Sequence, residues 1–315
     1  MKGLINVNVL LSSASNKVPL LRALKEAVMR LDVNGIVTAG DIKHDVLTRH
    51  FCDAFWHMPA TTDTNISEII SALKQQKITH ILPSRDGELL FWAKLKNQLK
   101  AEHIHVIVSN EKAVELCLDK LQFGQHDIPA IIPAFCDLRH CDASRFVVKE
   151  RFGAGSESVG INLNADDAFA HAEMLSAPLF QPYIDGQEIS VDAWLSKSHT
   201  VKAAICRVRA LVVNGESQVT YTLPTPSFLP DIVTTLSSLK LSGPVVLQAI
   251  ISGNELHIIE CNSRFGGAST LGIKAGVDSL YWSLCETLGI DIETLPLTLA
   301  KKKITQIRAA TDYYL

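Results

Sequence analysis

The sequence predicts an α/β domain with a parallel sheet, followed by an α+β region built largely from antiparallel strands. In the first part of the chain, apolar strand-like runs alternate with helical patterns, which is typical of a parallel sheet covered on both faces. A connecting helix is predicted over 110–121, and after it short strands with hairpin turns at 185–186 and 253–254 dominate. We therefore expect two domains in the 315 residues, covering 1–112 and 113–315.

The first domain should contain four strands and three further helices. The predicted strands are Leu4–Leu11, Val33–Thr38, His80–Pro83 and Val106–Val108, and the predicted helices begin near Pro19 and cover Ile66–Leu73 and Asp86–Leu99. Pro19 suits the first turn of a helix. Ligands of parallel sheets bind at the carboxyl ends of the strands, which here carry 12–17 and 84–88. These segments either face a ligand or the next domain, or they are solvated loops and helix caps.

Composition excludes several classes of protein. The net charge is −3 and no basic block is present, so neither nucleic acid nor an anionic membrane is expected as a partner. The seven cysteines have irregular spacing, which favours reduced thiols and a cytoplasmic protein. No signal peptide or membrane-spanning segment is evident. Cys136, His140 and Cys141 lie close together, but three ligands without a second pair are weak evidence for zinc.

The second region carries the pattern that is richest in chemistry. Its predicted strands are Phe146–Lys149, Leu179–Ile184, Ile189–Leu195, Val201–Val208, Val245–Ile251 and Leu256–Cys261. Side chains alternate along a strand, so Glu260, Asn262 and Arg264 should share one face while Ile259 and Cys261 enter a core. Oxygen ligands followed by a cation suit a site that holds Mg2+ on phosphate.

Gln248 is the third oxygen ligand that this pattern predicts. Counting back from the turn at 252–254 places it across from Glu260, or one residue away. The alternative for Glu260 and Asn262 is a hydrogen-bonded surface ladder, and the alternative for Gln248 is a buried amide satisfied by backbone. The sequence therefore predicts a cation site formed by two neighbouring strands.

Two further segments suit nucleotide binding. Lys149 precedes a loop of small residues at 153–160, whose backbone N–H groups could approach phosphate oxygens; a flexible surface hairpin is the alternative. The segment 181–192 combines extended backbone, which can meet the edge of a purine, with Glu188, which can bind ribose hydroxyls. A half-exposed strand would show the same alternation.

Taken in order, these motifs resemble the ATP-grasp superfamily, and most of all carbamoyl-phosphate synthase large subunits and the related carboxylate–amine ligases. The order is Asp119-Lys120, Lys149 with its loop, 181–192, Gln248, and Glu260-x-Asn262-x-Arg264. The resemblance covers nearly the whole chain. It implies a Rossmann-like N-terminal domain over 1–112 and an ATP-grasp fold of two α+β subdomains, a small lid at about 120–184 and a metal-binding subdomain at about 185–315.

The resemblance also implies roles for individual residues. Lys120 and Lys149 would contact the α- and β-phosphates, and a loop that includes Gly153, Gly155 and Ser156 would close over the triphosphate of ATP. The adenine ring would lie against the backbone of Gln181, Tyr183 and Ile184, and Glu188 would bind ribose. The metal ligands would be Gln248, Glu260 and Asn262, holding Mg2+ or, alternatively, Mn2+. Arg264 would stabilise the transferring phosphoryl group, with Lys149 and Arg207 adding positive charge.

The reaction shared by such proteins is formation of an acyl phosphate from ATP and a small carboxylate, which an amine then attacks to form an amide. Phosphoryl transfer needs positioning and charge neutralisation more than a covalent nucleophile. The alternative is an ATP-binding module or subunit with little chemistry of its own. A homodimer is the default expectation for the assembly.

The chain departs from the family pattern near the phosphates. Glu150 stands where proline is usual, and it is expected to change the charge beside the phosphates. Glu157 and Ser158 replace a basic residue and glycine, and Pro182 replaces a common glutamate. Pro182 keeps its carbonyl but has no N–H.

Overall fold

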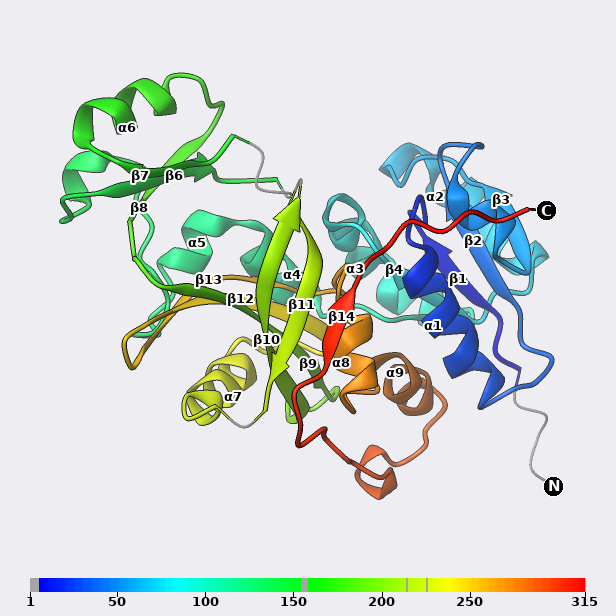
Figure 1. Ribbon diagram of the computed structural model, residues 1–315. Helices are drawn as coiled ribbons and strands as arrows, with labels where there is room; N and C mark the ends of the chain where they lie inside the picture. Colours follow the sequence, from blue (N-terminus) through cyan, green and yellow to red (C-terminus); the bar gives the residue numbers. More distant parts are fainter. Residues whose placement is uncertain (1–5, 154–157, 214, 225, 315) are drawn as a thin grey trace.

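The chain folds around three β-sheets in the computed structural model, which describes residues 6–153, 158–213, 215–224 and 226–314 (Figure 1). One sheet is parallel and two are antiparallel, so the predicted fold class is confirmed. The strands are β1 Val9–Ser12, β2 Val37–Asp41, β3 Ala54–His57, β4 His80–Pro83, β5 His105–Val106, β6 Phe146–Glu150, β7 Gly160–Leu163, β8 Pro178–Pro182, β9 Gln187–Leu195, β10 Val201–Val213, β11 Glu216–Leu223, β12 Gly243–Ser252, β13 Glu255–Asn262 and β14 Thr305–Ile307. The α-helices are α1 Val18–Met29, α2 Ile66–Gln75, α3 Asp86–Ala101, α4 Glu111–Leu118, α5 Lys120–Gly124, α6 Ala165–Ala172, α7 Leu229–Ser238, α8 Thr270–Lys274 and α9 Ser279–Thr287.

The N-terminal sheet has the order β3-β2-β1-β4-β5, with all its pairs parallel. One face packs against α1, whose leucines join a core that also contains α9, and the other face packs against α2 and α3. The predicted helix near Pro19 and the strand over 80–83 are present. The second strand begins at Val37, later than predicted, because Val33 is 82% exposed and precedes a turn at Gly35.

The predicted connecting helix is divided at Asp119. Its backbone is extended there (φ −97°, ψ 95°), which ends α4. The Asp119 carboxylate then accepts the N–H groups of Leu121 and Gln122 and so caps α5. Lys120 consequently stands at the first position of a new short helix.

The central sheet has six strands in the order β13-β12-β9-β10-β11-β14. Its apolar face carries Ile189, Val191 and Leu247, which pack into a core that includes α7. At one end of the opposite face, Trp194 packs against Trp282 of α9. Further along that face lie polar side chains, with Val246 and Ile250 between them. The sequence analysis missed β11 and β14 as strands, and β14 is the edge strand beside β11.

The small sheet has the order β7-β6-β8 and, with α6, forms the separate unit at the upper left of Figure 1. Phe146, Val148 and Phe180 form its core with Ala168 of α6. Within the described parts of the chain, no helix is both long enough and apolar enough to cross a membrane.

Candidate functional site

A row of polar side chains crosses four strands of the central sheet. Glu260 pairs with Gln248, Gln248 with Ser190, and Ser190 with Arg207. Directly paired residues point to the same face, and strands lie about 4.8 Å apart, so the row is roughly 14 Å long. The sequence placed Gln248 across from Glu260 or one residue away, and the direct pairing is the one observed.

The strand that carries Glu260 contains a bulge. The pairing shifts between Gln248–Glu260 and Ala249–Ile258, which leaves Ile259 as an extra residue. Ile258 and Cys261 are therefore the residues fully buried in the core, and Ile259 is only partly buried. The expectation that Ile259 enters the core is wrong for this reason, while Glu260 keeps its place on the polar face.

Glu260, Asn262 and Lys149 come together from two sheets. The Asn262 amide donates to Glu260 Oε1 at 3.1 Å. Lys149 on β6 is buried, and burial lowers its pKa to about 8, although Glu260 acts to raise it and Lys120 acts to lower it further. Among the described residues Lys149 has no ion-pair partner within salt-bridge distance, and its buried ammonium group could receive an anion.

The candidate metal ligands are one carboxylate and two amides. Among the described residues, no group of three or more His, Cys, Asp and Glu side chains could hold a metal ion, and this includes Cys136, His140 and Cys141. The donor set of Gln248, Glu260 and Asn262 contains only hard oxygens, which suits a cation that keeps phosphate oxygens as further ligands.

Arg264 is held by a carboxylate from the N-terminal domain. Its Nε and one terminal nitrogen donate to the two oxygens of Asp86, both at 2.6 Å. Burial acts to lower the pKa of Arg264, but Asp86 and then Glu260 outweigh it, so the pKa is raised. Asp86 is the first residue of α3, at the carboxyl end of β4. The segment 84–88 therefore faces the next domain, one of the two readings that the sequence left open.

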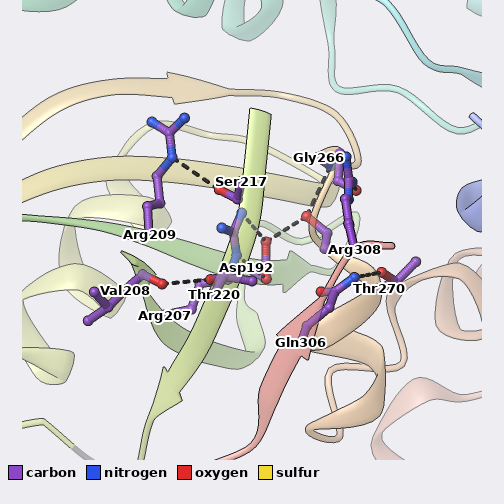
Figure 2. Close-up of polar contacts among 12 residues, drawn as sticks. Asp192, Arg207, Val208, Arg209, Ser217, Thr220, Gly266, Thr270, Gln306 and Arg308 are labelled. Carbon is purple, nitrogen blue, oxygen red and sulfur yellow. Dashed lines mark hydrogen bonds and ion pairs between the residues drawn. The ribbon is translucent and has the colours of Figure 1, made fainter. Parts of the chain in front are cut away.

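Arg207 is 4% exposed and pairs with Asp192 through its Nε at 2.9 Å. Asp192 also accepts from Ser269 at 2.6 Å, and Ser269 accepts the N–H of Gly266 at 3.0 Å. Figure 2 shows this chain of contacts, which connects the sheet to the turn after Arg264. Arg207 is thus a buried residue of the site rather than an exposed strand arginine.

Lys120 contacts the segment that follows Lys149. Its ammonium group donates to the carbonyl of Gly153 at 2.6 Å, and Arg151 pairs with Asp119. Gly153 has a φ of +120°, which an L side chain rarely adopts. Gly155 and Ser156, which were predicted to cover the triphosphate, and Glu157 lie outside the described residues.

The segment predicted to meet adenine begins within β8 and continues past its end. Gln181 is buried, and its side chain donates to the carbonyl of Ile132 at 3.0 Å. The backbone N–H of Tyr183 donates to Arg145 at 2.9 Å, and Ile184 lies next in the chain, partly buried. These contacts, together with the pairing of Gln181 with Val147 of β6, fix the backbone of the segment.

Glu188 pairs with Arg209 in this structure. Arg209 also donates to Ser217 and to the carbonyl of Gly215, so all parts of its guanidinium are engaged. A ribose bound by Glu188 would share that carboxylate with Arg209. The sequence analysis missed Arg209, although its alternation with Arg207 along one strand was a visible signal.

Glu150 does not lie beside Lys149 on the same side of the strand. Its carboxylate accepts the N–H groups of Ser176 and Ala177, at 2.6 and 3.0 Å. Consecutive side chains point to opposite faces. The expected change of charge beside the phosphates is therefore corrected: Glu150 anchors the loop before β8.

Two known domain families match this chain. The model of the ATP-grasp domain matches residues 104–268, and that of the PylC-like N-terminal domain matches residues 9–107. No curated protein matches.

Solved structures share the fold at low identity. Phosphoribosylglycinamide synthetase from Anaerococcus prevotii has a TM-score of 0.70 at 13% identity, over 96% of this chain and 80% of that one. The biotin carboxylase domain of 2-oxoglutarate carboxylase from Hydrogenobacter thermophilus has a TM-score of 0.69 at 15% identity, over 90% of this chain and 70% of that one. An L-amino acid ligase from Bacillus licheniformis has a TM-score of 0.65 at 16% identity, over 90% of this chain and 74% of that one. The ATP-grasp match spans more than half of the 315 residues, and the chain belongs to the ATP-grasp domain family.

Proposed function

We propose that this protein is an ATP-dependent ligase. It activates a small carboxylate as an acyl phosphate and joins it to an amine, releasing ADP and phosphate. The observation that carries the proposal is the row Glu260–Gln248 with Asn262, facing the buried Lys149. Membership of the ATP-grasp family supports carboxylate activation by ATP. The finer likeness to carbamoyl-phosphate synthase large subunits rests on the order of the motifs.

The residues present fit Mg-ATP. Lys149 is buried and forms no ion pair with the residues that the structure describes, so a phosphate oxygen would supply it with a partner. Gln248, Glu260 and Asn262 would hold Mg2+, or Mn2+, together with phosphate oxygens. The metal, when bound, would polarise the phosphoryl oxygens and neutralise charge on the leaving ADP.

The protein's own groups would position the two reactants. Lys120 and Lys149 would hold the phosphates, and the backbone of Gln181, Tyr183 and Ile184 would hold adenine. Arg264, kept in orientation by Asp86, would neutralise charge on the transferring phosphoryl group. Arg207, paired with Asp192, would face the substrate further along the same sheet.

Phosphate release from Mg-ATP tests the proposal. The purified protein would be screened against a matrix of carboxylates and amines, and products would be identified by mass spectrometry. Release that requires one acid, with ADP and a condensed product, is expected. Tight Mg-ATP binding without release for any pair would instead indicate an ATP-binding module that lacks ligase chemistry of its own.

A further inference from the structure

Unpartnered polar atoms gather on the polar face of the central sheet. Among the described residues, six buried side-chain nitrogen or oxygen atoms have no hydrogen-bond partner. One belongs to His126. The other five are Ser190 Oγ, Arg207 Nη1, Ser263 Oγ, Gln306 Oε1 and Arg308 Nε. Buried polar groups are almost always satisfied in folded proteins, so a cluster of exceptions indicates a site completed by something else.

Arg207 supplies the first free donor of this cluster. Its Nε and one terminal nitrogen face Asp192, which leaves Nη1 without a partner. Ser190, directly across on the neighbouring strand, is 1% exposed and its hydroxyl is also unpartnered. Both belong to the row that begins at Glu260.

Arg308 supplies the second free donor, from the opposite end of the chain. It follows β14, and its terminal nitrogens contact Glu216 at 2.8 Å and the carbonyl of Gly267, while Nε has no partner. Gln306 of β14 donates to Thr270 at 2.9 Å. Figure 2 shows Arg308 beside Gly266, and Gln306 donating to Thr270, the residue after Ser269.

The charges favour a singly charged anion. A guanidinium can only donate hydrogen bonds, so the free N–H groups require an acceptor. Asp192 pairs with Arg207, and Glu216, which is 65% exposed, pairs with Arg308 at 2.8 Å. Because both arginines already have a carboxylate partner, their free N–H groups suit a singly charged carboxylate better than a phosphate with two charges.

Arg207 lies some distance along the sheet from the place where the reacting carboxylate is expected. Arg207 lies two strands from Gln248, roughly 10 Å at the usual spacing. The carboxylate that accepts phosphate must lie near the metal ligands and Arg264. A group held by Arg207 and Arg308 is therefore a different part of the substrate.

We propose that Arg207 and Arg308 bind a second carboxylate, so that the acid activated by this protein is a dicarboxylate or an acidic amino acid. This rests on the proposed ligase function for the identity of the reacting group. Arg308 is then a specificity-determining residue, and β14 is part of the substrate site.

Calorimetric binding tests this without requiring turnover. The dicarboxylates from malonate to adipate, L-aspartate and L-glutamate would each be compared with the monocarboxylate of equal chain length, in the presence of Mg-ADP. At least one diacid should bind the wild-type protein about 10-fold or more tightly than its partner. Equal affinities throughout, or no binding of any diacid, would overturn the proposal.

The variant Arg308→Gln should reduce that diacid affinity about 10- to 100-fold and leave Mg-ADP affinity unchanged. Lys302→Gln, which removes an exposed charge from the segment entering β14, is the matched control and should bind like wild type. Diacid affinity retained in Arg308→Gln would contradict the assignment. If Arg308→Gln does not fold, the proposal is decided by whether the wild-type protein binds a diacid more tightly than the matching monocarboxylate. Diacid binding without ATP turnover would instead refute the ligase function and leave this site intact.

Discussion

Asp86 and Arg264 are 178 residues apart in sequence and form a two-point ion pair, with both nitrogen–oxygen distances at 2.6 Å. The pair joins the first turn of α3 in the N-terminal domain to the residue that follows the candidate metal ligands. Both side chains are less than 20% exposed, so solvent screens the pair little. The N-terminal domain therefore fixes the direction of an arginine in the site.

Replacing Asp86 by Asn should lower kcat about 10- to 100-fold while the KM for ATP changes little, because a misplaced guanidinium affects phosphoryl transfer more than nucleotide binding. Steady-state kinetics would measure both constants. Asp278→Asn is the matched control, since Asp278 forms an ion pair with Arg30 at 2.6 Å between α1 and the start of α9, away from the site. A kcat that stays at the wild-type value in Asp86→Asn would show that Asp86 does not position Arg264.

Replacing Glu260 by Gln should abolish Mg2+-dependent ATP turnover and leave the fold intact, because the only carboxylate of the predicted metal ligand set is lost. ADP production at varied Mg2+ and circular dichroism are the measurements. Glu255→Gln on the same strand is the control, because Glu255 is exposed at the turn. Normal turnover in Glu260→Gln would refute the metal assignment.

Replacing Lys149 by Met should stabilise the free protein at pH 7 by about 1–3 kcal/mol, since it removes a buried charge. The pKa of Lys149 falls from 10.5 to about 8 on folding, so the cost is fully present below pH 8 and disappears as the pH rises toward 10.5. Urea unfolding should therefore show that the stabilisation by Lys149→Met becomes smaller as the pH rises from about 8 toward 10.5.

The same variant should bind Mg-ATP more weakly, and wild-type affinity should fall as the pH rises through about 8, when Lys149 loses its charge. Lys94→Met, an exposed change on α3, should alter neither property. A less stable Lys149→Met protein at pH 7 would contradict a net cost of burying the Lys149 charge.

Replacing Glu150 by Gln should lower the free energy of unfolding by about 1–2 kcal/mol and leave Mg-ATP affinity unchanged, because its carboxylate accepts the backbone N–H groups of Ser176 and Ala177. Urea unfolding and calorimetry would measure the two quantities. Higher Mg-ATP affinity in this variant would indicate that Glu150 faces the phosphates after all.

The predictability of this site differs between residues for physical reasons. Gln248 could be placed within one residue of Glu260 because a tight turn fixes the register of two adjacent strands, and the bulge at Ile259 then sets the two residues directly opposite each other. The bulge at Ile259 could not be foreseen, because it depends on how the two strands pack together. Glu150 was placed beside the phosphates from its position next to Lys149, whereas strand alternation turns it away.

The sequence by itself determined the parallel and antiparallel regions and the polar alternation that carries Glu260, Asn262 and Arg264. Those features follow from local periodicity and turns, which neighbouring residues encode. Only the tertiary structure decided that Asp86 holds Arg264, that Arg209 engages Glu188, and that β14 brings Arg308 to the turn after Arg264. Each of these contacts joins segments whose relative positions depend on the packing of separate elements, and no local pattern specifies that packing.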